Sequence, residues 1–360
     1  MTRLVLASRG DALTPYLFGA LRRRFPVAGQ LDVDLTPAQR YLTAAGSFRP
    51  SRDAWVERFY KSTLAYRFRS RNAERQLRGL NGYDAVVQVH ALFDVPQADS
   101  LLYIDCTHRQ SAAQWPQWNP LSGADLTRWY EREGAEYHRA RHLFAFCEPT
   151  RRSLIDEYGV SPERVTTTGA GVNLDQLPEL TGTATAPTIL FIGNDFVRKG
   201  GKVLLEAFRA VRAAVPGARL QLVGTDPHIR RQDGVEVLGR IHDRRTIERL
   251  YRQASVFALP SYFDPFPLVL LEAMAFGLPT VSTRSCGIPE IVEDGRTGTL
   301  VPTGDAAALA KALITTLSDR ATARRQGLAG RARVQRLYTW DAVVDRMAPA
   351  LQGDSLRSSA

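Results

Sequence analysis

Two carboxylates, one just before a predicted helix and one inside it, have the clearest chemical potential in this 360-residue sequence. Asp264 precedes the helix and Glu272 lies within it. The N–H groups of Phe266, Leu268 and Val269 should point out of the helix start, where the partial positive charge of the helix favours a phosphate. Each carboxylate could accept two hydroxyl hydrogen bonds. The segment therefore predicts a site for a phosphate and for the hydroxyls of a sugar or ribose.

Each carboxylate also has a purely structural interpretation. Asp264 before Pro265 could be no more than a helix N-cap, which contributes about 1 kcal/mol. Glu272 is flanked by apolar residues such as Leu271 and Ala273, so its carboxylate needs hydrogen-bond partners or a ligand. The functional interpretation is therefore stronger for Glu272 than for Asp264.

The elements that must position these residues alternate between short β-rich runs and helices, which is typical of parallel sheets covered by helices. In the first half the predicted strands are Leu4–Ala7, Ala85–Val89, Leu101–Ile104, Leu143–Phe146 and Val165–Thr168, and the clearest helices are Ala54–Leu80 and Leu126–Arg141. In the second half the predicted strands are Thr188–Ile192, Arg219–Val223, Val235–Leu238, Val256–Leu259, Thr280–Thr283 and Thr299–Val301. The helices between them are predicted at Lys202–Val215, Arg244–Gln253, Leu268–Ala275 and Ala306–Leu317.

This pattern predicts an α/β protein of two doubly wound, Rossmann-like domains, over 1–176 and 187–337. The Thr-, Pro- and Gly-rich segment Gln176–Pro187 is the expected linker. The carboxyl ends of the two sheets are expected to face each other across a cleft, where such folds bind ligands. Neither G-x-G-x-x-G nor G-x-x-x-x-G-K-[ST] occurs, which disfavours a dehydrogenase or a P-loop enzyme. Residues 353–360 should form a frayed tail.

The segment Ser261–Pro279 resembles the signature of the retaining nucleotide-sugar glycosyltransferases of family 4, which have the two-domain GT-B fold. In that family two acidic residues, separated by seven others, precede a Glu-Ala-Met-x-x-Gly-x-Pro-like helix end; here they are Asp264 and Glu272. Further segments match in order at Phe191–Gly200, Leu204–Phe208, Leu222–Gly224, Val237–Gly239, Gly287–Val292 and Asp294–Gly298. Tyr338–Asp341 looks like the start of the family's last helix, about 338–352, which packs back on the first domain. The match is specific over 187–345 and loose before that.

The resemblance implies a role for each matching residue. Arg198 and Lys199 would face the donor diphosphate, where two cations can neutralise the leaving group; outside this motif set the same pair could be a solvated turn. Asp264 would hold donor-sugar hydroxyls and Glu272 the ribose. The other donor contacts implied are Gly10, Gly193, Gly239, Arg240, Ile241, Phe266, Leu268 and Val269. The donor would be a UDP- or GDP-sugar, with no metal or other cofactor.

Two histidines compete for the place beside the transferred sugar. The family carries an active-site histidine after a first-domain strand, and His108, in Ile-Asp-Cys-Thr-His, fits that description. His90, in Val-Gln-Val-His, also follows a predicted strand. Either histidine could instead be structural, so the choice between them stays open, with His108 favoured.

The sequence departs from the family at several of these positions. Asp264 stands in place of the usual Glu, and Pro267 stands where Gly is common. Asn194 replaces the Arg that often follows the Gly after the first strand of the second domain, which leaves Arg198 to compensate. Gly10–Asp11 replaces a common Gly-Gly. These changes leave the identity of the donor open.

The excess positive charge is concentrated at the start of the chain. Residues 1–80 hold 15 Lys/Arg against 6 Asp/Glu, and the other 280 residues hold 32 against 31. Aromatic residues such as Trp55, Phe59 and Tyr60 lie among these arginines, which suggests contact with an anionic membrane surface. A merely solvated basic face is the alternative. A nucleic-acid partner is disfavoured because no recognised binding module is present.

These observations predict a cytoplasmic enzyme, peripheral on the inner face of the cell membrane. Its first apolar run, Leu4–Ala7, is too short for a secretory signal, and its three cysteines show no metal spacing. The expected reaction is retaining transfer of a hexose-type sugar to a hydroxyl of a lipid-linked or cell-envelope glycan acceptor. The alternatives are a soluble small-molecule acceptor, a GT-B epimerase or phosphorylase, and a degenerate member that binds nucleotide without turnover.

Overall fold

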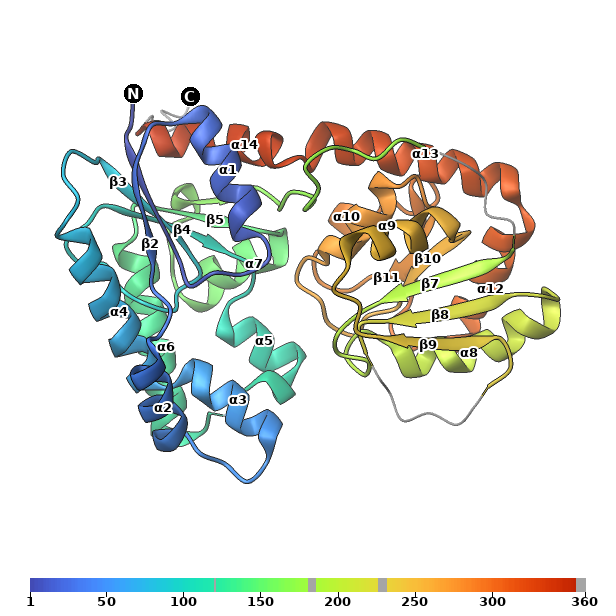
Figure 1. Ribbon diagram of the computed structural model, residues 1–360, viewed down its shortest axis with the longest axis horizontal. Coiled ribbons are helices and arrows are strands. Elements are labelled where there is room, and N and C mark those ends of the chain that lie inside the picture. Colours follow the sequence, from blue (N-terminus) through green and yellow to red (C-terminus); the bar gives the residue numbers. More distant parts are fainter. Residues whose placement is uncertain (120, 181–185, 226–231, 354–360) are drawn as a thin grey trace. The chain divides into compact units, whose positions relative to one another are not determined.

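The structure is a computed structural model that describes residues 1–119, 121–180, 186–225 and 232–353 (Figure 1). The chain divides into two compact units. The first comprises Met1–Gly169 and the segment that begins at Trp340, and the second comprises Ala170–Thr339. Part of the predicted linker, 181–185, and the tail residues 354–360 lie outside the described ranges.

The first unit is built on a six-stranded parallel sheet with the order β2-β1-β3-β4-β5-β6. Its strands are β1 (Leu4–Ser8), β2 (Val27–Asp32), β3 (Ala85–Val89), β4 (Ser100–Ile104), β5 (His142–Ala145) and β6 (Val165–Thr167). The central strands β1, β3, β4 and β5 are buried along their whole length, which explains their continuous apolar sequences. The sequence did not reveal β2, because this strand is half-exposed and carries polar residues and Gly29.

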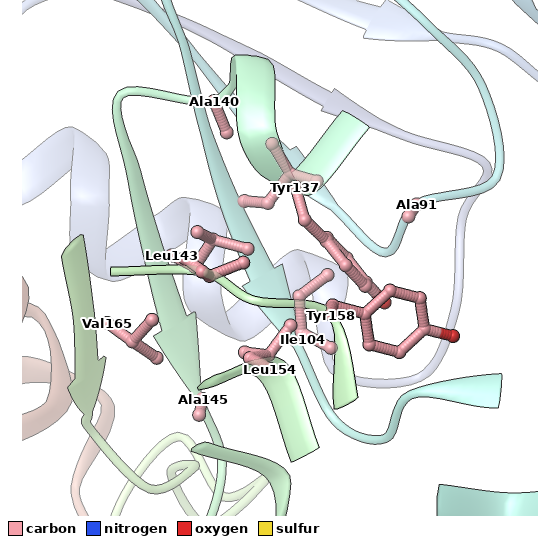
Figure 2. Packing of buried hydrophobic residues seen from close by; sticks show 11 residues of the cluster. Ala91, Ile104, Tyr137, Ala140, Leu143, Ala145, Leu154, Tyr158 and Val165 are labelled. Atoms are coloured by element: carbon pink, nitrogen blue, oxygen red, sulfur yellow. The ribbon is translucent and has the colours of Figure 1, made fainter. Parts of the chain in front are cut away.

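Helices cover this sheet. They are α1 (Thr14–Arg24), α2 (Pro37–Gly46), α3 (Arg52–Lys61), α4 (Thr63–Leu77), α5 (His108–Gln114), α6 (Gly123–Arg139), α7 (Glu148–Arg152) and α14 (Trp340–Gln352), with short turns of 3-10 or π helix at Pro116–Trp118, Ser153–Glu157 and Pro162–Arg164. Figure 2 shows part of the core under the sheet: Tyr137 and Ala140, at the end of α6, belong to one buried cluster with Ile104 of β4 and Leu143 of β5. The rings of Tyr137 and Tyr158 meet edge to face at 5.0 Å.

The single helix predicted over Ala54–Leu80 is wrong in one respect: the structure has two helices there. Ser62 adopts an extended conformation between α3 and α4, and its side-chain oxygen accepts a hydrogen bond from the N–H of Ala65. Ser is a preferred N-cap because it satisfies an N–H that has no acceptor within its helix. The break therefore has a local cause that the apolar periodicity did not show.

The second unit has its own six-stranded parallel sheet, with the order β12-β11-β10-β7-β8-β9. Its strands are β7 (Thr188–Ile192), β8 (Arg219–Val223), β9 (Val235–Gly239), β10 (Val256–Leu259), β11 (Thr280–Thr283) and β12 (Gly298–Val301). Its helices are α8 (Gly201–Ala214), α9 (Arg244–Gln253), α10 (Leu268–Ala275), α11 (Ile288–Ile291), α12 (Ala306–Ser318) and α13 (Arg320–Leu337). The prediction of a doubly wound α/β architecture is thus confirmed for both sheets.

The sequence analysis missed α13, which lacks a strong apolar stripe. This helix instead approaches the end of α10 through small residues: a Cβ atom on Gly327 would lie 1.9 Å from the carbonyl oxygen of Gly277. Such close contact needs glycine, and glycine lowers the helical signal of the sequence.

Each sheet has one point where the strand order reverses. The chain runs from β1 outward to β2 and then returns to β3 on the other side of β1. In the second unit it runs from β7 through β8 to β9 and returns to β10 on the other side of β7. Ligands of doubly wound folds bind beyond the carboxyl ends of the strands at such switch points. The β1/β3 and β7/β10 points are therefore where functional residues are expected.

Candidate functional site

A cluster of three charged residues occupies the β7/β10 switch point of the second unit. Lys199 Nζ lies 2.8 Å from Asp264 Oδ2, and Arg198 Nη1 lies 3.6 Å from the same oxygen. Arg198 also donates to the backbone carbonyl of Phe263 at 2.7 Å and pairs through Nε with Asp195 at 3.2 Å. Arg198, Lys199 and Asp264 are all buried. The structure thus brings together the two cations and the first acid that the sequence singled out.

The turn after β7 fixes this geometry. Gly200 has φ 77°, and a Cβ atom there would lie only 1.9 Å from the carbonyl oxygen of Pro260, which follows β10. Only glycine combines this left-handed conformation with so close a backbone approach. Because Gly200 lets the turn pack directly on the end of β10, the side chain of Lys199 reaches Asp264.

Glu272 is buried on α10. Its Oε2 accepts a hydrogen bond from the Tyr251 hydroxyl at 3.0 Å, and its Oε1 lies 3.3 Å from Arg244 Nη1. Burial raises the pKa of Glu272, and the neighbouring Arg244 and Tyr251 only partly oppose this effect. Sequence reasoning missed both partners, although Arg244 and Tyr251 are two turns apart on α9 and so share one helix face.

Helix α10 begins at Leu268, as predicted, but Asp264 is not its N-cap and Phe266 lies before the helix. Pro267 is its N-cap and donates no hydrogen bond, and the N–H groups of Leu268 and Val269 have no acceptor within the helix. Both residues are half-buried, whereas the Phe266 ring is buried edge-on against Tyr338 at 5.9 Å. Phe266 therefore also anchors the loop that carries Asp264.

The remaining donor positions predicted in the second unit lie at strand ends on the same edge of the sheet. Gly193 directly follows β7, and a Cβ atom there would lie 2.4 Å from Lys199 Cδ. Gly239 ends β9 with φ 63° and is followed by the exposed Arg240 and the half-buried Ile241. These residues stay predictions as ligand contacts, and their placement is compatible with that role.

We expect the substitution Glu272→Gln to weaken nucleotide binding about tenfold. An amide presents one acceptor atom where the carboxylate presents two, and a hydrogen bond to a charged group contributes about 1.5–3 kcal/mol. Isothermal titration with UDP and with GDP measures the effect, with thermal unfolding to verify the fold. The control is Glu206→Gln on α8, where the carboxylate is exposed. Unchanged affinity for both nucleotides in Glu272→Gln would show that the ribose does not bind there.

In the first unit, a histidine lies between two carboxylates at the β1/β3 switch point. His90 Nε2 lies 3.2 Å from Asp11 Oδ2, and its Nδ1 lies 3.1 Å from Asp105 Oδ1. Burial disfavours its charge, but Asp105 and Asp11 outweigh burial and raise the pKa of His90 to about 10. Burial alone would raise the pKa of Asp11, yet His90 and Thr14 lower it to about 2. At neutral pH the cluster is therefore an imidazolium held by two carboxylates.

His108 has a different environment, at the start of the helix that follows β4. It is the first residue of α5 and is buried, with Nε2 2.8 Å from Asn119 Oδ1 and ring contacts to Trp129 and Tyr130. Burial and the charge of Lys61 lower the pKa of His108 to about 4, so its imidazole is neutral at pH 7. Of the two histidines, His90 is the one placed at the switch point.

Asp11 and Asp105 were not among the predicted site residues, although each follows a strand of the first sheet closely. That position was the signal that could have identified them. Gly10, which was predicted, has φ 78° and is exposed, and an added Cβ atom would meet no heavy atom within 4 Å. The space beside Gly10 is therefore open to a ligand.

Comparison with known proteins gives the site its context. Residues 186–319 match the family model "Glycosyl transferases group 1". A phosphatidyl-myo-inositol mannosyltransferase of Mycobacterium leprae is 35% identical over 190 residues, 49% of this chain and 50% of that protein. A putative colanic acid biosynthesis glycosyltransferase, WcaL, of Salmonella typhimurium is 30% identical over 211 residues, 54% of this chain and 52% of that protein. The chain thus spans about half the length of the curated relatives it matches.

Solved structures extend the comparison to the fold of the whole chain. A sucrose-phosphate synthase of Thermosynechococcus elongatus superposes with a TM-score of 0.69 at 22% identity, covering 98% of this chain and 99% of that one. WaaG, a glycosyltransferase involved in lipopolysaccharide biosynthesis, gives 0.67 at 16% identity, covering 98% and 100%. The two parallel sheets and these neighbours show that the chain has the two-domain GT-B fold, as predicted.

The match to the family model lies within the second unit. Residues 186–319, which include Arg198, Lys199, Asp264 and Glu272, are a glycosyl transferases group 1 domain. This confirms the resemblance to family-4-like glycosyltransferases that these residues carried.

Proposed function

We propose that this chain is a retaining glycosyltransferase that moves a hexose-type sugar from a UDP- or GDP-sugar to an acceptor hydroxyl, without a metal. The observation that carries the proposal is the buried cluster of Arg198, Lys199 and Asp264 at the β7/β10 switch point, inside the group 1 domain. Two buried cations, which here pair with Asp264 and Asp195, suit a ligand with both phosphates and sugar hydroxyls.

The chemistry divides among these side chains. As the bond from the anomeric carbon to the diphosphate breaks, Lys199 and Arg198 neutralise the negative charge that grows on the leaving group. Asp264 accepts hydrogen bonds from the sugar hydroxyls, and Glu272 accepts those of the ribose. The acceptor oxygen bonds to the anomeric carbon on the same face, and its proton passes to an oxygen of the departing phosphate. Retention follows from this front-face path.

For the first unit we assign the role beside the reacting sugar to His90 instead of His108. Its charge is fixed by Asp11 and Asp105, and the open space at Gly10 adjoins Asp11. A fixed imidazolium orients both carboxylates so that their remaining lone pairs can accept hydroxyl hydrogen bonds.

The acceptor we propose is a lipid-linked or cell-envelope glycan, reached from an anionic membrane surface. Support comes from the names of the relatives, which include a phosphatidyl-myo-inositol mannosyltransferase and a lipopolysaccharide glycosyltransferase. It also comes from an apolar ridge on the first unit, which we define as the exposed residues Tyr41, Leu42 and Phe48, followed by the exposed Arg49 and Arg52. Among the described residues, no helix is long and apolar enough to cross a membrane.

A donor-hydrolysis screen tests the proposed reaction. The full chain is incubated with UDP-, GDP- and ADP-sugars without acceptor, and released nucleotide is measured; we expect slow turnover of one UDP- or GDP-sugar. Proton NMR of the early product from an α-linked donor should show the α anomer. Nucleotide binding without turnover of any donor would favour the degenerate, non-catalytic alternative. A β product would exclude retention.

A further inference from the structure

Two arginines on the first unit approach the same aromatic ring. Arg9 directly follows β1, and its guanidinium carbon lies 4.7 Å from the centroid of the Tyr60 ring. The guanidinium carbon of Arg69, on α4, lies 6.0 Å from that centroid. The charge of Asp34 acts on Arg69, but Asp34 is already paired with Arg40 at 2.5 Å. In the described ranges of the chain, neither Arg9 nor Arg69 forms an ion pair.

Arg69 is the more unusual of the two because it is 1% exposed. Its Nη1 donates to the Tyr60 carbonyl at 3.1 Å, while Nε and Nη2 have no hydrogen-bond acceptor among the described residues. Burial and the charge of Arg9 lower the pKa of Arg69 to about 10, so it stays charged at neutral pH. A buried, unpaired guanidinium is expensive for a fold, and a bound anion would offset that cost.

The position of Arg9 narrows the class of ligand. Arg9 is half-buried, and its buried Nε has no hydrogen-bond acceptor in the part of the chain that the structure describes. Asp11 lies two residues further along the same loop and is one of the two carboxylates around His90. These carboxylates can accept hydrogen bonds from the hydroxyl groups of a ligand. The β1/β3 switch point therefore presents a cation and hydroxyl-accepting carboxylates on one short loop, which matches a polyol that carries a phosphate.

We infer that Arg9 binds a phosphate group of the acceptor, and that Arg69, which approaches the same Tyr60 ring, acts as a positioning residue that adds positive potential. The inference rests on the proposed function, because it assigns the ligand to the acceptor. The competing source of the same chemistry is the donor diphosphate, since the adjacent Gly10 is implied as a donor contact. The test must separate these two sources.

Calorimetric titration of the full chain provides the test, with inorganic phosphate, glucose 6-phosphate and glucose as probes. We expect glucose 6-phosphate to bind at least about tenfold more tightly than glucose, because a guanidinium forms paired, charge-assisted bonds with phosphate. Saturating UDP should leave this binding intact. Arg9→Ala should weaken the binding of phosphate and of glucose 6-phosphate about tenfold. Arg9→Lys should weaken it less. Arg75→Ala, which removes an exposed arginine of α4, should have no effect.

Each other outcome overturns the inference. Equal affinities for glucose and glucose 6-phosphate, or an equal loss in Arg75→Ala, would mean that there is no specific phosphate site. Competition by UDP would assign Arg9 to the donor diphosphate. Arg69→Met, provided that it folds, should weaken phosphate binding less than Arg9→Ala does. If Arg69→Met does not fold, the two Arg9 variants alone decide whether the phosphate site exists. Failure of the proposed function is distinguishable, because donor hydrolysis would be absent while phosphate binding at Arg9 persisted.

Discussion

Replacing Lys199 with Ala should slow turnover of the donor by about a hundredfold or more, because the loss of one charge aimed at a developing anion costs roughly 3 kcal/mol of transition-state stabilisation. The rest of the Arg198–Asp264 cluster should stay folded in this variant. Asp264 keeps Arg198 as a neighbour at 3.6 Å, so its buried carboxylate is not left without a cation. The single substitution is therefore a cleaner test than removal of both cations, which would leave Asp264 uncompensated and endanger the fold.

The measurement is kcat for donor hydrolysis at saturating nucleotide sugar, with thermal unfolding as the test of the fold. Lys311→Ala on α12 is the matched control, since Lys311 is exposed. It should retain full activity. If Lys199→Ala kept half of the wild-type rate, Lys199 would be a structural partner of Asp264 and no more.

Binding to anionic vesicles should be measurable at low salt and largely lost by about 0.5 M salt, where the Debye length is well below its physiological value of about 8 Å. Each basic residue near such a surface contributes about 1 kcal/mol, and the apolar ridge adds burial in the interface. Phe48 packs edge-on against Trp55 at 5.5 Å, which holds one side of the ridge in place. Cosedimentation with phosphatidylglycerol-containing and purely phosphatidylcholine vesicles measures the effect.

The variants follow from the exposure of each residue. Reversing Arg67 and Arg71 to Glu should abolish vesicle binding and spare donor hydrolysis, since both side chains are exposed. Arg69 belongs to the same sequence run but is buried, so its reversal would test folding instead. Arg324→Glu with Arg325→Glu, on exposed positions of α13, is the matched charge control. Wild-type protein that ignores anionic vesicles at low salt would favour a soluble acceptor.

The sequence predicted the second unit better than the first for a physical reason. A parallel strand that is buried on both faces, such as β7 or β10, is a short apolar run and is easily located. The half-exposed β2 lacks that pattern, and α13 packs through glycines that weaken its helical signal. Composition also concealed that Arg69 is buried inside a run of exposed arginines.

The same contrast applies to the sites. Arg198, Lys199, Asp264 and Glu272 lie in local motifs, and the structure places the first three in one cluster. By contrast, the carboxylates around His90 come from two loops separated by more than ninety positions of the chain. Only the strand order of the first sheet brings them together, so spacing along the sequence could not indicate them.

The approach of Gly200 to the Pro260 carbonyl also determines where this protein can change during evolution. No side chain fits at position 200, so a mutation there would separate Lys199 from Asp264 although residue 200 need not touch any substrate. Arg240 and Ile241, beyond the end of β9, carry no such restriction, and Arg240 is exposed. Under the proposed function, divergence towards new nucleotide donors should therefore accumulate at the end of β9, while the turn after β7 stays unchanged.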